Sequence, residues 1–355
     1  MIIDCDVHIN PTSKCPMEPF VPPRYREAFA AKQTSAPGHG YANPFGVHRR
    51  DIEPIEDAAD LMRVHLDPLN ITYALLQPGP TIHASLIHAI DVANGYAQAA
   101  NDWLIANFLE KSPRFLGSVA VNMNDPAAAA AEIRRVGGHP QMVQVLTNGE
   151  STHLYGHRYY NPIYEACCEM GLVFAVHPGA EGSLNSTTPV GRPSSYFEWH
   201  NSLPLNFQGH LGSLIAEGTF ERFPELRVLL VEGGVSWLAP FLWRVDKNFK
   251  ALRSTVPWLK ERPSEYVFRH CRMTTQPVEE PDNPEHLVSL FSMIHAGRTV
   301  CFSTDFPHWD FDNPARAFPS CMPKEMKNRI LYDNAAELFG LPARPKVETQ
   351  EVVKQ

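Results

Sequence analysis

The feature that most constrains this chain is the regular alternation of short apolar runs with longer segments of helical pattern. Strands that alternate with helices form parallel sheets through right-handed crossovers, and eight such units close into a barrel. The sequence therefore predicts the α/β class and a (β/α)₈ TIM barrel. The eight predicted strands cover 2–8, 71–77, 115–122, 142–146, 172–177, 226–232, 272–276 and 299–305.

The segments between these strands predict the helices and two long loops. A barrel of this kind commonly forms one domain, so we expect a single domain over 1–342 and an extended, charged tail over 343–355. Many of the 32 prolines fall in long loops at 11–57 and 178–207, and long loops often form lids or binding walls. The predicted helices cover 91–109, 126–136, 162–170, 210–222, 235–252, 284–294 and 324–339.

Charge and cysteine usage argue against several classes of protein. The net charge is −8 and the chain has no long basic run, so we expect no nucleic-acid partner. The seven cysteines are scattered without a CxxC pair, which favours free thiols in a reducing compartment. The chain has neither a basic leader nor an apolar run of about 18 residues. We therefore expect a cytoplasmic protein that does not bind a membrane.

Side chains that commonly bind metals end four of the predicted strands. Asp6 and His8 end the first, His177 the fifth, Glu232 the sixth and Asp305 the eighth. Active sites of such barrels lie at the C-terminal ends of the strands, and residues two apart on a strand share a face. Nitrogen and carboxylate donors together suit Zn²⁺, Fe²⁺ or Mn²⁺. We therefore expect Asp6, His8, His177 and Asp305 to hold a divalent metal.

Each of these residues also has a structural explanation. A histidine at a strand end often bonds to backbone, and an aspartate after a strand often caps a helix. A single DxH pair is a weak signal for a metal site. The arrival of ligand-type residues at four strand ends, in the right order, favours one shared site.

Five short motifs in this chain carry a resemblance to a known family. They are IDCDVH at 3–8, VHP at 176–178, GTFERFP at 218–224, STDFPH at 303–308 and NAAELFG at 334–340. In wording and order they resemble the amidohydrolase-related (amidohydrolase 2) family, which includes aminocarboxymuconate-semialdehyde, resorcylate and carboxyvanillate decarboxylases. The resemblance covers most of the chain, and its motifs are specific to the family but not to one reaction.

The resemblance implies a metal-dependent enzyme with Asp6, His8, His177 and Asp305 as ligands. It implies a hydrolase or a non-oxidative decarboxylase that acts on a small carboxylated substrate. Many members have His or Glu at the first ligand position, so Asp6 is a carboxylate variant. The family's decarboxylases usually have a catalytic histidine at the end of the sixth strand, where this chain has Glu232. Either Glu232 takes the acid–base role, or the chemistry differs.

His210 and His308 are further candidates for catalysis. His210 is predicted to begin the helix before the sixth strand, and with Glu232 it could move a proton or hold a second metal. The structural alternatives are a backbone hydrogen bond for His210 and a buried pair with an arginine for Glu232. His308 follows Asp305 and could orient a ligand or a metal-bound water, or cap a helical segment.

Aromatic and basic residues in the long loops are candidates for substrate binding. Tyr196, Trp199 and His200 could line a substrate pocket, or simply pack their loop. Arg49 and Arg50 could pair with a substrate carboxylate, although solvated surface arginines are the simpler reading.

Three functions are compatible with this pattern. The first is the hydrolase or decarboxylase, with one Zn²⁺ or Mn²⁺. The second is a dinuclear non-haem Fe or Fe/Mn oxygenase that hydroxylates a C–H bond, which the presence of Glu232 favours. The third is a metal-binding supporting subunit of a hetero-oligomer. Trp and Phe residues near 306–318, which we expect to be exposed, favour a dimer, and we expect a homo- or hetero-oligomer.

Overall fold

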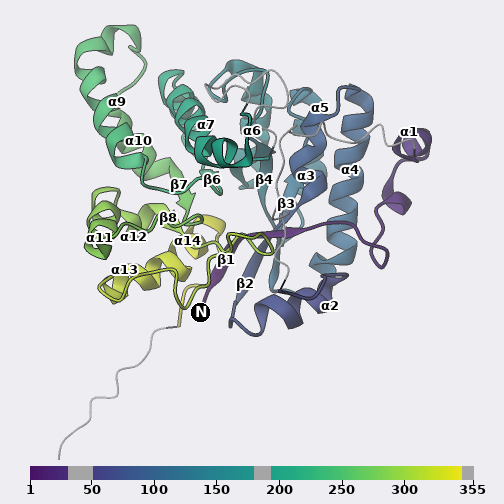
Figure 1. Cartoon of the computed structure of the whole chain (residues 1–355). Helices are drawn as coiled ribbons and strands as arrows, with labels where there is room; N and C mark the ends of the chain where they lie inside the picture. The colour runs from purple at the N-terminus through teal and green to yellow at the C-terminus, as the bar shows by residue number, and fades with distance from the viewer. Residues whose placement is uncertain (31–50, 180–192, 346–355) are drawn as a thin grey trace, which may run out of the picture.

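The computed structural model describes residues 1–30, 51–179 and 193–345, and its centre is one sheet of eight parallel strands. Their order in the sheet follows their order in the chain, from β1 to β8 (Figure 1). The strands are β1 (Ile3–Ile9), β2 (Tyr73–Pro78), β3 (Phe115–Ala120), β4 (Met142–Asn148), β5 (Val173–His177), β6 (Val228–Leu230), β7 (Cys271–Thr274) and β8 (Val300–Cys301).

Backbone contacts between β1 and the chain after β8 close the sheet. The Cys5 amide donates to the Phe302 carbonyl at 3.0 Å, and the His8 amide donates to the Phe306 carbonyl at 2.7 Å. Val7 and Phe306 form a parallel bridge. The closed sheet confirms the predicted (β/α)₈ TIM barrel.

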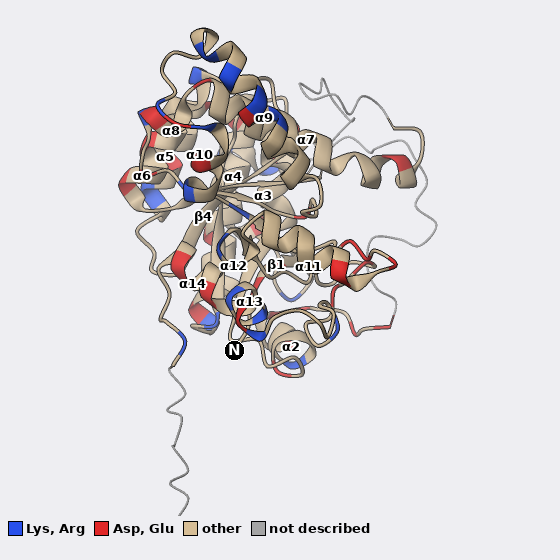
Figure 2. Cartoon of the chain, turned by 90° about the vertical axis from the view of Figure 1, so that its left-hand side faces the viewer, with Lys and Arg blue, Asp and Glu red and all other residues tan. Residues whose placement is uncertain are grey.

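The helices lie outside the barrel (Figure 1), and acidic and basic residues are spread over them (Figure 2). None of the described helices is both long and apolar enough to cross a membrane. The α-helices are α1 (Arg26–Ala30), α2 (Ala58–Leu61), α3 (Gly79–His83), α4 (Ile90–Asn107), α5 (Pro126–Val136), α6 (Asn161–Met170), α7 (Tyr196–Ala216), α8 (Thr219–Arg222), α9 (Leu238–Leu252), α10 (Pro263–His270), α11 (Pro284–Met293), α12 (Ala296–Thr299), α13 (Lys324–Asn328) and α14 (Asn334–Phe339).

Local sequence explains where these helices begin and end. Asp125 caps α5 by accepting the Ala128 amide at 3.2 Å, and Pro126 occupies the first turn, where its missing amide costs nothing. At the end of α6, Gly171 adopts φ 68°, a left-handed conformation that glycine reaches without strain.

The strands pack on both faces, as a barrel requires. A large apolar cluster joins one face of the strands to the surrounding helices, and a smaller cluster contains Cys5, Leu75, Leu116 and other strand residues with α14. Such double burial explains why the predicted strands are almost continuously apolar. The polar residues at their C-terminal ends therefore stand out against an apolar barrel.

The structure corrects the predicted loop at 178–207 and the predicted helix start at His210. Helix α7 begins at Tyr196, capped by the Ser195 side chain, and it contains Pro204. Proline removes one backbone hydrogen bond and usually marks a helix boundary, so the sequence before Pro204 does not predict a helix. Residues 180–192, the tail from 346, and Arg49 with Arg50 lie outside the described residues. The single-domain boundaries stay a prediction.

Candidate metal centre

Four side chains from two strands and one loop after a third strand converge at the mouth of the barrel. Asp6 and His8 come from β1, His177 ends β5, and Glu232 lies two residues after β6. One ligand atom from each of the four lies within 4.8 Å of the others. His8 Nε2 lies 3.2 Å from His177 Nε2 and 3.3 Å from Asp6 Oδ1, and His177 Nε2 lies 2.9 Å from Glu232 Oε2.

A second group shares two of these residues. His8, Glu232, Asp305 and His308 also bring one ligand atom each within 4.8 Å of the others. Asp305 Oδ1 lies 3.0 Å from His8 Nε2 and 2.6 Å from His308 Nδ1. The structure therefore brings together all four predicted metal ligands, and adds Glu232 and His308 beside them. Their role as ligands stays a prediction.

The backbone at two of these positions is strained. Glu232 has φ 62° and Asp305 has φ 58°, and for non-glycine residues the left-handed region costs on the order of 1–3 kcal/mol. The Glu232 amide is held by Thr274 Oγ1 at 2.9 Å, and the Asp305 carbonyl accepts the His308 amide at 2.8 Å. Strain of this kind clusters at functional sites. Both residues follow strands that end earlier than the sequence predicts, β6 at Leu230 and β8 at Cys301.

The carboxylates of Asp6 and Asp305 are buried without hydrogen bonds. Both residues are 0% exposed, and none of their four side-chain oxygens accepts a hydrogen bond of acceptable geometry from a described residue. Burying an ionised carboxylate without partners is costly. A divalent cation with oxygen and nitrogen ligands would satisfy these oxygens, so the residues fit such an ion.

Burial and neighbouring charged groups shift the pKa values of three residues in this cluster. Burial raises the pKa of Asp305 well above its usual value, and the nearby Glu232 and Asp6 carboxylates raise it further. Burial would also raise the pKa of Asp6, but His8 and His177 outweigh it and lower the value. Burial would lower the pKa of His177, but Glu232 and Asp6 raise it well above normal. The mouth therefore concentrates negative charge around two imidazoles.

Asp4 forms a hydrogen-bonded network directly behind this cluster. Its carboxylate accepts the Thr304 amide at 2.9 Å, the Thr304 hydroxyl at 2.6 Å and the Asp6 amide at 3.3 Å. It also lies 2.8 Å from Nε2 of His65, whose ring stacks on Phe306 with centroids 4.0 Å apart. The sequence alone predicts no role for Asp4 or His65. The only signal was the position of Asp4, two residues before Asp6 on the same strand.

The predicted position of His210 at the mouth is wrong. His210 lies in the second half of α7, is fully buried, and belongs to neither group of ligand atoms. Its Nε2 donates to the Gly149 carbonyl at 2.9 Å, and its Nδ1 accepts the Tyr155 amide at 3.3 Å. Burial lowers its pKa to about 4. Both ring nitrogens already serve the backbone, so His210 has no free nitrogen for a metal or a proton transfer.

The three predicted substrate-binding residues lie on the first turns of α7, next to the loop after β8. His200 Nε2 lies 3.0 Å from Asp310 Oδ2, and Trp309 Nε1 donates to the Tyr196 hydroxyl at 3.0 Å. The Trp199 ring lies 5.3 Å from the Tyr196 ring. These residues therefore pack over the loop that carries Asp305 and His308, and their contact with substrate stays a prediction.

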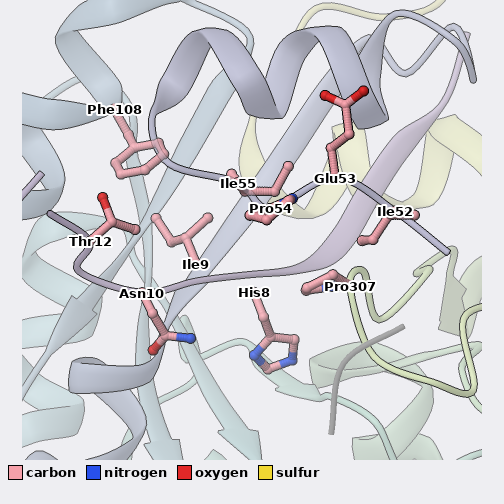
Figure 3. Close-up of a pocket in the computed structure, with 10 residues that line it drawn as sticks. All are labelled: His8, Ile9, Asn10, Thr12, Ile52, Glu53, Pro54, Ile55, Phe108 and Pro307. Carbon is pink, nitrogen blue, oxygen red and sulfur yellow. The ribbon is translucent and has the colours of Figure 1, made fainter. Parts of the chain in front are cut away.

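A cavity of about 300 Å³ opens beside His8 (Figure 3). Its walls come from the end of β1 and the described end of the first long loop. The lining residues are His8, Ile9, Asn10, Thr12, Ile52, Glu53, Pro54, Ile55, Phe108 and Pro307. Most of these are apolar, so the space suits a ring or an alkyl group rather than a charged one.

The barrel and its cluster of carboxylates and imidazoles define an amidohydrolase-type metal-dependent barrel. The family described as Amidohydrolase matches residues 3–341, so the chain belongs to the amidohydrolase family. The predicted resemblance is confirmed.

Two curated relatives are similar to this chain over most of its length. The chain is 27% identical to the gamma-resorcylate decarboxylase of Polaromonas sp. over 265 residues, which are 70% of this chain and 77% of the relative. It is 27% identical to the gamma-resorcylate decarboxylase of Rhodococcus jostii over 308 residues, which are 80% and 88%.

Solved structures support the fold. The 5-carboxyvanillate decarboxylase of Novosphingobium aromaticivorans, complexed with manganese and 4-hydroxy-3-methoxy-5-nitrobenzoic acid, gives a TM-score of 0.74 at 21% identity over 96% of each chain. The dihydroxybenzoic acid decarboxylase of Polaromonas sp., with bound manganese and the inhibitor 2-nitroresorcinol, gives 0.65 at 22% identity, also over 96% of each chain.

Proposed function

We propose that this protein is a metal-dependent non-oxidative decarboxylase of a small aromatic carboxylate. The observation that carries the proposal is the pair of buried carboxylates, Asp6 and Asp305, whose oxygens accept no hydrogen bond from described residues and which meet two imidazoles. The relatives support it, because several are decarboxylases of aromatic acids and two have manganese bound.

The proposed ligands of the cation are Asp6, His8, His177 and Asp305. Manganese is the first choice of metal because it is the ion in the two solved relatives, and zinc and iron are alternatives with similar ligand preferences. A divalent cation at this place would bind the substrate's oxygen atoms and stabilise the negative charge that develops on them.

Decarboxylation requires one proton to be delivered to carbon. The bond between the ring carbon and the carboxyl carbon breaks, its electron pair stays on the ring carbon, that carbon takes a proton, and carbon dioxide leaves. We assign proton delivery to the side of the mouth lined by Glu232 and His308, because both lie beside the ligands and can exchange protons. Glu232 stands where the family's decarboxylases usually have a histidine.

The substrate ring is proposed to contact two surfaces. One is the apolar wall beside His8, which includes Ile9, Ile52 and Ile55. The other is the start of α7, where Tyr196, Trp199 and His200 pack against the loop after β8. Aromatic and aliphatic walls beside a few polar groups are typical of small-molecule sites.

The test is carbon dioxide release from a panel of aromatic acids that includes 2,6-dihydroxybenzoate and 5-carboxyvanillate. Protein loaded with manganese should release carbon dioxide and the decarboxylated phenol in equal amounts, without oxygen consumption. Chelation, or the His177→Ala variant, should abolish release. The matched control is His295→Ala. His295 is exposed and lies before the first residue of β8, at the end of this strand away from the mouth. Intact metal binding without carbon dioxide from any acid would refute the proposal.

The dinuclear oxygenase and the supporting subunit stay predictions. The same assay distinguishes them from the decarboxylase. The dinuclear oxygenase requires oxygen uptake coupled to substrate hydroxylation. The supporting subunit requires a metal-loaded chain that is inactive alone, within a hetero-oligomer in which the partner turns over substrate. Size-exclusion chromatography with light scattering would test the predicted oligomer.

A further inference from the structure

We propose that Glu279, in the segment after β7, is a positioning residue that holds Glu232 in place for proton delivery. This inference rests on the proposed function, in which Glu232 and His308 line the side of the mouth that delivers the proton. In that reaction the ring carbon takes a proton from the Glu232 carboxyl group as carbon dioxide leaves, and the resulting carboxylate regains a proton from water.

The backbone at Glu232 needs support from the residues around it. Glu232 has φ 62°, and Gly234 has φ 59°, so the chain turns sharply soon after β6. Glycine reaches this left-handed region without strain, whereas a residue with a side chain keeps it only where the surrounding structure holds it there. A release of this turn would therefore move the Glu232 carboxyl group from its place at the mouth.

Two neighbouring elements hold the first half of the turn. The Glu232 amide donates to Thr274 Oγ1 at 2.9 Å, and Thr274 lies on β7, the neighbour of β6 in the sheet (Figure 1). A Cβ atom at Gly233 would collide with the ring of Phe207 on α7, so this ring packs directly against the backbone. These contacts fix Glu232 and Gly233 from two sides.

The carboxylate of Glu279 holds the second half of the turn. Its Oε1 accepts the Ser236 hydroxyl at 2.7 Å, the Ser236 amide at 3.1 Å and the Val235 amide at 3.2 Å, and its Oε2 accepts the Val235 amide at 3.3 Å. A Cβ atom at Gly234 would collide with Glu279 Oε1, so the glycine makes room for the carboxylate. Hydrogen bonds to an ionised carboxylate are roughly twice as strong as neutral ones. One side chain therefore fixes two consecutive amides directly after the turn.

The segment that carries Glu279 is itself tied to the loop after β8. The amide of Val278, the residue before Glu279, donates to Asp312 Oδ2 at 3.0 Å. Asp312 follows His308 in that loop. The segment after β7 therefore bridges the two loops that carry the proton-delivering side chains, and it fixes where Glu232 lies relative to His308.

Glu279 acts through the backbone and not at the mouth itself. It is partly exposed and belongs to neither group of mutually close ligand atoms. Its removal should therefore leave the proposed ligands and the apolar wall for the substrate in place. A misplacement of about 1 Å by a distant substitution can lower a catalytic rate about 100-fold. The expected signature is a lower kcat at unchanged KM and unchanged Mn²⁺ affinity.

Three substitutions of Glu279 separate its position from its charge. Glu279→Ala removes the acceptor, and kcat for carbon dioxide release should fall about 10–100-fold. Glu279→Gln loses the charge but keeps an acceptor oxygen at the same length, so it should keep most of the rate. Glu279→Asp keeps the charge but withdraws it by one methylene group, so it should lose rate as the alanine variant does. The matched control is Glu280→Ala, because Glu280 is the exposed neighbour, and its kcat should equal that of the wild type.

The measurements are steady-state kinetics of the manganese-loaded chain, a Mn²⁺ titration and amide hydrogen exchange, all under conditions where urea unfolding shows the variants to be folded. In Glu279→Ala the Val235 and Ser236 amides should exchange about 10–100-fold faster, because their bonds to a charged group are lost. A wild-type kcat in Glu279→Ala would overturn the proposal. A full rate in Glu279→Asp with a loss in Glu279→Gln would overturn it too, and so would a fall in Mn²⁺ affinity that matches the fall in kcat.

The outcome for the decarboxylase is read separately from the same samples. Carbon dioxide release at the same kcat in the wild type and Glu279→Ala would keep the decarboxylase and refute the positioning role. No carbon dioxide from the wild type with any acid would refute the proposed function, and hydrogen exchange would still test the hold of Glu279 on the turn. Equally slow exchange in Glu279→Ala would overturn that hold, whether or not an acid is decarboxylated.

Discussion

Asp4 and Asp6 lie two residues apart on β1, and the structure treats their carboxylates in opposite ways. Both are 0% exposed. Asp4 accepts hydrogen bonds from the Thr304 amide and hydroxyl and from the Asp6 amide, and it pairs with His65. The two oxygens of Asp6 accept none from described residues.

We interpret this difference as the one between a structural carboxylate and a carboxylate proposed to bind the metal. A buried polar group without partners costs about 1–3 kcal/mol, and more when it is charged. Asp4 avoids that cost within the polypeptide, because Thr304 and His65 supply its donors. Asp6 and Asp305 have imidazoles beside them but accept no hydrogen bond of acceptable geometry from described residues, so a cation that completes the site would compensate their burial.

The largest expected effect follows from Asp6→Asn. Removal of an outer partner of a ligand weakens metal affinity about 10–100-fold, so loss of a ligand should weaken it by more and abolish carbon dioxide release. The unfolding free energy of the metal-free protein should fall less than in Asp4→Asn, because the change removes the pairs of Asp6 with His8 and His177 but also removes a negative charge beside Asp305. A Mn²⁺ titration and urea unfolding measure the two quantities. Unchanged Mn²⁺ affinity would contradict the assignment of Asp6 to the binding class.

The reverse pattern is expected for Asp4→Asn. A buried hydrogen-bonding group left without its partner typically costs about 1–3 kcal/mol, and this change places an amide against the donors of Thr304 and His65. Urea unfolding of metal-free protein should show a loss of that size. The matched control is Asp67→Asn, whose exposed pair with Arg114 should contribute less than about 1 kcal/mol. Equal losses in the two variants would mean that the Asp4 network does not stabilise the fold.

The sequence predicted the barrel and most of the cluster, because both depend on local patterns. Apolar runs ending in ligand-type residues placed Asp6, His8, His177 and Asp305 at one mouth, and the structure brings them together. The sequence could not predict the Asp4 network. Its contacts with His65 and Thr304 span 61 and 300 residues, and no local pattern encodes them.

The choice between His210 and His308 shows a second limit. A prediction that began the helix at His210 placed this histidine at the mouth. The additional turns of α7, which pass through Pro204, instead bury it against Gly149 and Tyr155. For His308, the short separation in sequence from Asp305 was enough to predict a position beside the cluster. A short separation along the chain was therefore a more reliable guide to which histidine lies at the mouth than the predicted start of a helix.

His210 is hydrogen-bonded to the backbone and is not one of the proposed metal ligands. It should make the free energy of unfolding depend on pH. Burial lowers its pKa from 6.5 to about 4 in the folded protein. Its contribution to stability is therefore complete above pH 6.5 and is lost as the pH falls from 6.5 to about 4, where only the unfolded chain gains the proton. The shift corresponds to about 3 kcal/mol.

The measurement compares the wild type with His210→Gln by urea unfolding at pH 7 and pH 4. Other groups titrate over the same range, so the test is the difference between the two proteins. The wild type should lose about 3 kcal/mol more than the variant on acidification. Equal losses would show that the His210 ring is not held neutral by burial.

The smallest expected effect tests whether the hydrogen-bonded network of Asp4 positions Asp305 for metal binding. Thr304 Oγ1 donates to Asp4 at 2.6 Å and accepts the Phe306 amide at 3.1 Å, so this hydroxyl fixes the backbone on both sides of Asp305. Thr304→Val keeps the shape and loses the hydroxyl, and Mn²⁺ affinity should fall about 10–100-fold. Thr304→Ser keeps the hydroxyl and should bind Mn²⁺ like the wild type.

The comparison of these two variants distinguishes positioning from general stability. Valine should lower the unfolding free energy by about 1–3 kcal/mol, because Asp4 loses a donor. If the network only stabilises the fold, folded Thr304→Val should bind Mn²⁺ as tightly as Thr304→Ser in the same titration. If it positions Asp305, affinity should divide the two variants under conditions where both are fully folded, because the hydroxyl holds the amide that follows the ligand.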